Sequence, residues 1–318
     1  MTDNLLKVGT LTVAPGGKAV GVEELKIGEQ TVRFPIFVVN GAQPGPTLAV
    51  TAGIHGAEFA SIEAALQVGR ATTPEGLAGR LIIVAVANMP AFLARAIYVC
   101  PLDGKNLNRV FPGQADGTAA EQIAFWLFEN VIRQADYYVD MHGGDLIEAL
   151  VPFTIYHDSG NAAVNQASLE IARAFGIPYI LRSESLGGTF SAAARAGIPA
   201  ILTEAGGQGI WRQRDVKWHV DGLNRLMRHL GIIKGARPRP VATREFAQSF
   251  WLRSDHEGYW YPAVSVGETV RQGQDLGHVA DFQGNVLQPV ACPADGVVLF
   301  LVSSLAINPG DPLLSVGA

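Results

Sequence analysis

The sequence contains little cysteine and no run of charge of one sign. Only two cysteines occur among 318 residues, Cys100 and Cys292, which excludes a disulfide framework and a cysteine-based zinc site. We expect both to be small buried thiols in a reduced compartment, which favours a cytoplasmic location. The net charge is −5 and no cluster of lysine and arginine is present, so we expect no nucleic-acid partner.

Long apolar stretches are also absent. The most apolar segment, residues 81–94, is interrupted by Asn88 and Pro90 and is too short to cross a bilayer. The first ten residues lack the charged and apolar parts of a secretory signal, so we expect neither export nor a membrane partner. The composition is 48% hydrophobic and 17% charged with 36 glycines, which is typical of a compact, loop-rich globular protein.

Strand and helix patterns divide the chain into regions. Residues 1–40 alternate apolar and polar side chains and predict antiparallel strands. From about 46 to 232, short apolar strands alternate with helices, which predicts an α/β fold with a mixed, largely parallel sheet sandwiched by helices. A Pro- and Gly-rich linker is predicted at 236–245. We therefore predict a first domain at 1–235 and an all-β module at 246–318.

Two of the predicted helices carry clear signals. Thr118 and Glu121 have the spacing of a capping box, and an apolar side chain then recurs at every fourth position, as on one face of a helix. A second helix is predicted to begin near Asp215, because apolar residues form a single stripe from there to Leu230.

A histidine and a glutamate lie three positions apart where a strand pattern gives way to a helical one. His55 and Glu58, in TAGIHGAEFASIEAAL, can aim both side chains at one point above a strand end. His142 ends the strand pattern YYVDMHGG, and Asp140 can hydrogen-bond the far nitrogen of a ligating imidazole. Hydrolytic zinc is commonly held by three nitrogen or oxygen side chains, so this set predicts a metal site.

Another strand end and one loop carry residues suited to catalysis. Glu204 ends the pattern ILTEAGG, where a carboxylate beside a metal can act as general base and then protonate a leaving amine. Asn108 and Arg109, in DGKNLNRVFPG, can grip a carboxylate. Each residue also has an ordinary explanation: a core histidine, a surface acid or a local ion pair. The residues favour a metal hydrolase and leave these explanations open.

Four motifs occur in an order that resembles a known family. GIHGAE, DGKNLNRVFPG, DMHGG and TEAGG are similar to motifs of the succinylglutamate desuccinylase/aspartoacylase family, within the zinc carboxypeptidase-like superfamily. The resemblance covers roughly residues 45–318, and it extends to bacterial members that deacylate N-acyl amino acids, including N-acetyl-diaminobutyrate. It implies a zinc-carboxypeptidase-like fold and hydrolysis of the linear amide bond of a small N-acylated amino acid.

The resemblance also implies roles for individual residues. One zinc ion per chain would have three ligands: His55, Glu58 and His142. Glu204 would be the general base and acid, and Asn108 and Arg109 would hold the substrate carboxylate.

The chain departs from the family at one position. Members usually place an arginine about ten residues before the Asn-Arg pair, where it polarises the scissile carbonyl. Here Tyr98 takes that place, with Arg95 three residues earlier. Either Arg95 reaches the substrate, or Tyr98 donates a weaker hydrogen bond, or the reaction differs. Loss of such a donor costs roughly 10²–10³ in rate.

The C-terminal sequence resembles the barrel-sandwich fold of biotinyl and lipoyl carrier domains. No lysine follows Lys234, so covalent carriage of a cofactor is excluded. We expect the module to cover one side of the active site or an interface in a homo-oligomer.

The sequence thus predicts a zinc-dependent amidohydrolase whose partner is a small N-acyl amino acid. Two alternatives stay open. One is a metallocarboxypeptidase acting on peptide C-termini. The other is a non-catalytic metal-binding sensor, which the missing arginine favours.

Overall fold

The computed structural model describes residues 4–318, and its largest element is a nine-stranded sheet. From one edge to the other its strands are β12 (Arg244–Phe246), β10 (Tyr179–Ser183), β9 (Phe153–His157), β11 (Ala200–Glu204), β7 (Tyr137–His142), β5 (Gln43–Ala52), β6 (Ala78–Val84), β4 (Gln30–Asn40) and β3 (Gly17–Ile27). Neighbours pair in parallel, except at β9–β11, β6–β4 and β4–β3. The predicted mixed, largely parallel sheet is confirmed.

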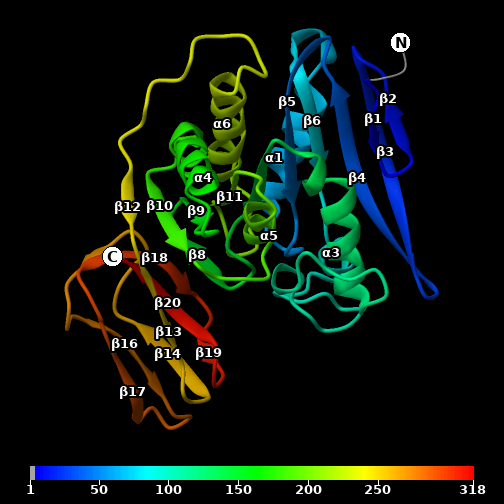
Figure 1. The fold of residues 1–318 in the computed structure, drawn as a ribbon. Coiled ribbons are helices and arrows are strands. Elements are labelled where there is room, and N and C mark those ends of the chain that lie inside the picture. The colour runs from blue at the N-terminus through cyan, green and yellow to red at the C-terminus, as the bar shows by residue number, and fades with distance from the viewer. Residues whose placement is uncertain (1–3) are drawn as a thin grey trace.

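Helices cover both faces of this sheet (Figure 1). They are α1 (Phe59–Ala71), α2 (Met89–Ala94), α3 (Ala119–Asn130), α4 (Ala162–Phe175), α5 (Thr189–Arg195) and α6 (Gln213–His229), with short 3-10 turns η1 (Pro74–Gly76), η2 (Leu107–Arg109) and η3 (Ile132–Gln134). Helices α1, α4 and α6 share one apolar core with the sheet, and α3 and α5 share the other. Because both faces are buried, the central strands are apolar along their whole length.

The sequence signals for single elements hold in most details. Helix α3 follows Thr118, whose backbone N–H donates to the Glu121 carboxylate at 2.8 Å, as the capping box predicts. Helix α6 begins at Gln213, close to the predicted start at Asp215. At the N-terminal end, β1 (Leu6–Val8) and β2 (Leu11–Val13) form a small antiparallel pair beside the antiparallel β3–β4 hairpin.

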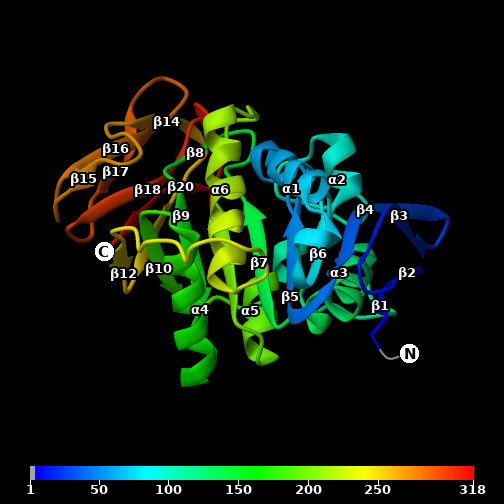
Figure 2. The same cartoon turned by 90° about the horizontal axis from the view of Figure 1, so that it is seen from above.

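The C-terminal module consists of strands alone. They are β13 (Ser249–Arg253), β14 (Gly258–Pro262), β15 (Thr269–Val270), β16 (Asp275–Ala280), β17 (Val286–Ala291), β18 (Gly296–Val302), β19 (Ala306–Ile307) and β20 (Pro312–Gly317). They form two sheets, β13-β20-β18-β15 and β17-β16-β14-β19, around a core that includes the buried Trp260. The predicted all-β module is confirmed, and Figure 2 places it at the opposite end of the molecule from β1 and β2.

The two regions exchange strands at their boundary. The short β8 (Glu148–Leu150) follows β7 in sequence but pairs antiparallel with β18 of the module. Conversely, β12 begins within the last two residues of the expected linker and pairs with β10 in the large sheet. Residues 236–243 form neither helix nor strand. The boundary at 235–246 stays a prediction, and the exchanged strands tie the two regions together. None of the helices within residues 4–318 combines the length and apolar character needed to cross a membrane.

Candidate metal centre

Three neighbouring parallel strands, β5, β7 and β11, bring their carboxyl ends to one edge of the sheet. His142 is the last residue of β7, and Glu204 is the last residue of β11. The loop after β5 carries His55, and Glu58 immediately precedes α1. Residues distant in sequence therefore meet at the edge where open α/β sheets usually bind ligands.

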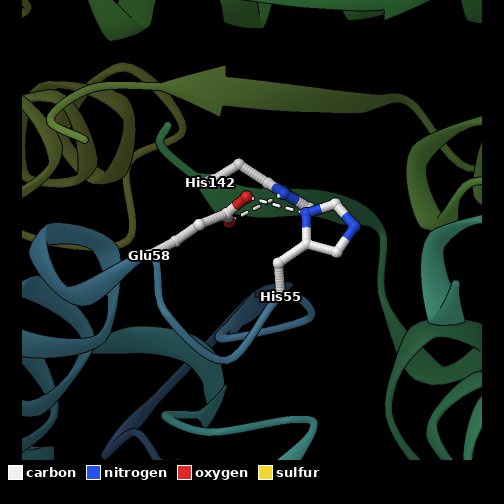
Figure 3. Close-up of side chains that lie close together, drawn as sticks. All are labelled: His55, Glu58 and His142. Carbon is white, nitrogen blue, oxygen red and sulfur yellow. Dashed lines mark hydrogen bonds and ion pairs between the residues drawn. The ribbon is translucent and has the colours of Figure 1, made fainter. Parts of the chain in front are cut away.

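The three predicted metal ligands lie in contact with one another. Nδ1 of His55 lies 2.7 Å from Oε1 of Glu58, and Nδ1 of His142 lies 2.9 Å from Oε2 of the same carboxylate. Figure 3 shows both imidazole rings turning a nitrogen toward Glu58. One donor atom from each residue falls within 4.8 Å of the others. Two nitrogens and one carboxylate at this separation can converge on a single ion.

The outer nitrogen of each imidazole is held by an oxygen. Nε2 of His142 lies 2.7 Å from Oδ2 of Asp140, the contact that the sequence predicts. Nε2 of His55 lies 3.1 Å from Oδ1 of Asn106, which also accepts the backbone N–H of Asn108 at 2.8 Å. Oδ1 of Asn106 and Oδ2 of Asp140 each accept a hydrogen bond from another donor, so these oxygens carry no hydrogen. Each can only accept a hydrogen bond from the imidazole. Both outer nitrogens therefore carry a hydrogen, so each inner nitrogen presents a lone pair whenever its imidazole is neutral.

This arrangement fits a bound cation. Two lone pairs facing one carboxylate repel it unless a proton or a metal ion lies between them. Burial alone would raise the pKa of Glu58, yet His142 and His55 bring it down to about 2. No lysine or arginine in residues 4–318 pairs with the acids of the site, which are the buried Glu58, Asp140, Asp145 and Glu148 and the partly buried Glu204. A divalent ion would supply the missing positive charge, so the donor set suits zinc.

Glu204 lies directly beside His142 in the parallel ladder between β11 and β7. Residues in register point to the same side of a sheet, so both side chains emerge at the metal centre. Oε2 of Glu204 is buried and has no hydrogen-bond partner. Burial, and after it the charge of Glu58, raises the pKa of Glu204 well above its ordinary value. The predicted base therefore stands at the centre with one oxygen free.

Asn108 and Arg109 lie in the 3-10 turn η2 at the rim of the site. Asn108 is buried, and its side-chain oxygen accepts the backbone N–H of Thr189 at 3.1 Å. Arg109 is exposed, and Nη1 donates to the Asn108 carbonyl at 2.8 Å. Desolvation, and after it the charge of Arg253 from the module, lowers the pKa of Arg109. No carboxylate within residues 4–318 pairs with Arg109, so its guanidinium is free for an anion.

The structure separates Tyr98 from Arg95. The Tyr98 ring stands edge-on to His55, with ring centroids 6.4 Å apart. Arg95 caps the end of α2 in a left-handed conformation with φ 52°, and it is exposed. The side chain of Arg95 makes no hydrogen bond or ion pair with the part of the chain that the structure describes. Tyr98 therefore borders the metal centre, whereas Arg95 points into solvent.

Two acids after His142 were missed at the sequence level. The Tyr98 hydroxyl donates to Oε1 of Glu148 at 2.7 Å, and the Tyr98 backbone N–H donates to Oδ2 of Asp145 at 2.9 Å. Burial raises the pKa of Glu148 to about 7. The run HGGDLIE holds both acids and could have suggested them. Asn106 was missed too, although it stands two residues before Asn108 in the same motif.

The paired glycines after the two strand ends permit close packing. Gly144 donates its backbone N–H to the Gly206 carbonyl at 2.9 Å. A Cβ on Gly143 would lie only 2.5 Å from the Ala205 carbonyl oxygen, so any side chain there would force the loops apart. The glycines thus hold together the loops that follow His142 and Glu204.

Comparison with known proteins agrees with this arrangement. A family model described as the succinylglutamate desuccinylase/aspartoacylase catalytic domain matches residues 44–230, which include all the site residues described above except Arg253. The chain belongs to the succinylglutamate desuccinylase/aspartoacylase family. This membership confirms the resemblance carried by the four motifs, and it makes the chain one of a family named for enzymes that remove acyl groups.

Individual members of the family are similar over nearly the whole chain. The N-alpha-acetyl-L-2,4-diaminobutyric acid deacetylase of Halomonas elongata is 32% identical over 293 residues, which cover 89% of this chain and 84% of that protein. The product-bound ectoine utilization protein EutE (DoeB) of Ruegeria pomeroyi has a TM-score of 0.89 at 28% identity, over 100% of both chains. A Rhodobacter sphaeroides succinylglutamate desuccinylase/aspartoacylase reaches 0.87 at 28% identity, over 96% of this chain and 97% of that one. The predicted fold is confirmed by these matches.

Proposed function

We propose that this family member is a zinc-dependent amidohydrolase that cleaves a small N-acylated amino acid into a carboxylate and a free amino acid. One observation carries the proposal: the inner nitrogens of His55 and His142 converge on the buried Glu58 carboxylate, while their outer nitrogens are held by oxygens. A bound zinc ion would polarise the acyl carbonyl and make water a stronger nucleophile at neutral pH.

The chain's own residues would handle the proton and the substrate. Glu204, with one buried oxygen free, takes the proton of the attacking water and passes it to the departing amine. Arg109 and Asn108 bind the substrate carboxylate at the rim, so that the acyl group faces His142 and Glu204. Tyr98 orients His55 and borders the acyl group. Arg95 is exposed at the end of α2, so we assign it no contact with the carbonyl. Homo-oligomer formation and a cytoplasmic location stay predictions.

The names of the relatives favour one kind of substrate. The Halomonas elongata relative is a deacetylase of an N-acetylated diamino acid, and its similarity extends over most of both chains. We infer that the acyl group here is short and that the amine product is a free amino acid.

The test is a substrate panel with and without zinc. The purified protein is treated with a chelator, zinc is restored, and release of acetate, succinate or formate from N-acyl amino acids is measured beside release of amino acids from dipeptides. We expect acyl release that is lost on chelation and restored by zinc. Faster cleavage of dipeptides than of every N-acyl amino acid would instead support a carboxypeptidase.

A single substitution tests the base. Glu204→Gln keeps the shape of the side chain and removes its basicity, so we expect turnover to fall roughly 10²–10⁴-fold while zinc binding persists. Elemental analysis of the variant provides the control. Near-normal turnover in this variant would exclude Glu204 as the base.

A further inference from the structure

The three metal ligands belong to a closed ring of hydrogen bonds and ion pairs that passes through the substrate loop. On the inner side, Glu58 bridges the two imidazoles. On the outer side the ring is completed by four residues: Asn106, Asn108, Thr189 and Asp140. No gap interrupts it from His55 to His142. A displacement of the loop that carries Asn106, Asn108 and Arg109 is therefore transmitted to both imidazoles.

Thr189 forms the link on the His142 side by itself. Its hydroxyl donates to Oδ2 of Asp140, the same oxygen that holds Nε2 of His142. Its backbone N–H donates to the side chain of Asn108 at 3.1 Å. Thr189 is completely buried at the first position of α5, in the connection between β10 and β11. It lies in none of the four sequence motifs.

We propose that Thr189 is a positioning residue that couples the metal ligand His142 to the Asn108–Arg109 loop, so that zinc and the substrate carboxylate each strengthen the binding of the other. This proposal rests on the proposed function for the identity of the two ligands. Its physical basis is the shared oxygen of Asp140. A hydroxyl donor fixes the rotamer of that carboxylate, the carboxylate fixes the imidazole, and the backbone of the same threonine fixes the loop.

The effect of losing the Thr189 hydroxyl depends on the contacts that Asp140 keeps. Without it, Asp140 keeps the Thr51 hydroxyl on its other oxygen, at 2.7 Å, but Oδ2 is held by His142 alone. The carboxylate can then rotate with the imidazole. Changes to groups that orient a metal ligand typically weaken metal affinity by about 10–100-fold. The backbone N–H of Thr189 keeps its bond to Asn108, so the loop is affected because the start of α5 is no longer tied to Asp140.

The chain offers a matched control for a threonine-to-valine change. Thr154 on β9 is also completely buried, but its hydroxyl has no hydrogen-bond partner. Replacing it with valine removes the same atom in the same kind of environment and breaks no contact. Any effect specific to Thr189→Val is therefore due to the link and not to the loss of a buried hydroxyl in general.

The experiment compares Thr189→Val, Thr189→Ser and Thr154→Val with the unmodified protein. Zinc affinity is measured by chelator competition on the intact protein, and KM and kcat are measured with the N-acetyl amino acid that is cleaved fastest. For Thr189→Val we expect zinc affinity about 10–100-fold weaker and a KM raised more than kcat is lowered. Serine keeps the donor, so Thr189→Ser should stay within about threefold on both measures, as should Thr154→Val.

Two results would contradict the proposed coupling through Thr189. Wild-type zinc affinity in Thr189→Val, or a serine variant as weak as the valine variant, would overturn the coupling. If valine prevents folding, Thr189→Ala takes its place, and the contrast with serine is unchanged. Zinc affinity is measured without turnover. A protein that binds zinc but cleaves no N-acyl amino acid would thus refute the proposed function and leave the metal arm of this test intact.

Discussion

The two histidines of the metal centre are held in different ways. His142 ends a central strand, is 1% exposed, and contacts the buried carboxylate of Asp140. His55 stands in a loop, has a side chain 12% exposed, and contacts the neutral amide of Asn106. One imidazole is thus fixed by a rigid sheet and a negative charge, the other by a loop and an uncharged oxygen. The comparison indicates that His142 on β7 would be the rigid anchor of a bound ion and His55 the more adjustable ligand.

This difference has a physical reason. A charged acceptor raises the basicity of a ligating imidazole more than a neutral one does, and it can be buried only where other donors also satisfy it. Asp140 has those donors, because the hydroxyls of Thr51 and Thr189 both donate to it. Asn106 needs no such support. A neutral partner can therefore stand in the loop that carries Asn108 and Arg109, the proposed substrate-binding residues.

The largest effect is expected from removing the anchor. His142→Ala should abolish zinc binding and also destabilise the metal-free protein by about 3–5 kcal/mol, because the buried carboxylates of Glu58 and Asp140 would each lose an ion-pair partner. His55→Ala should also lose zinc but cost less stability, since that side chain is partly accessible. Elemental analysis and urea unfolding measure the two quantities. Equal losses of stability in the two variants would remove the distinction between anchor and adjustable ligand.

An intermediate effect is expected from the partners of the two imidazoles. Asp140→Asn keeps the shape and removes the charge, so zinc affinity should fall about 10–100-fold. Asn106→Ala removes a neutral hydrogen bond worth roughly 1 kcal/mol, so the expected loss is about fivefold. Chelator competition on both variants gives the ratio of their zinc affinities. A larger loss for Asn106→Ala than for Asp140→Asn would reverse the comparison.

The smallest effects concern the two residues near the missing arginine. Arg95→Gly removes the guanidinium, and glycine suits the left-handed backbone there, so neither stability nor turnover should fall. Tyr98→Phe keeps the ring beside His55 and removes the hydroxyl that binds Glu148, with an expected cost near 1 kcal/mol in stability. A loss of turnover of about 10²-fold in Arg95→Gly would mean that this arginine does reach the carbonyl.

Much of this site could be predicted from the sequence, for reasons tied to particular residues. His55, His142 and Glu204 stand at or just after the ends of apolar strands, each within two residues of a glycine, and parallel strands bring such ends together. Glu58 follows His55 by three residues, at the start of a helical pattern. The capping box at Thr118 marks the start of a helix through contacts within one turn. These signals are local, so spacing along the chain reveals them. The roles of the four site residues remain predictions.

The remainder depends on contacts between distant segments. Thr189 meets Asp140 and Asn108 only after α5 packs on the sheet, and no spacing in the sequence records that. The sequence also could not show which of Arg95 and Tyr98 lies at the metal centre. The answer depends on the end of α2, where Arg95 itself adopts a left-handed conformation and its side chain stays exposed. Strand exchange at the module boundary is likewise a property of pairing and not of composition.

Strand β8 has a consequence for any attempt to shorten or recombine this protein. It follows His142 closely in the chain, carries Glu148 toward Tyr98, and yet bonds to β18 of the module. A truncation that removes the module would take β18 away from this strand and leave the backbone amides of β8 facing water beside the candidate metal centre. Chimeras that graft a foreign C-terminal region should therefore take β8 and β18 from the same parent, because the two strands are hydrogen-bonded to each other.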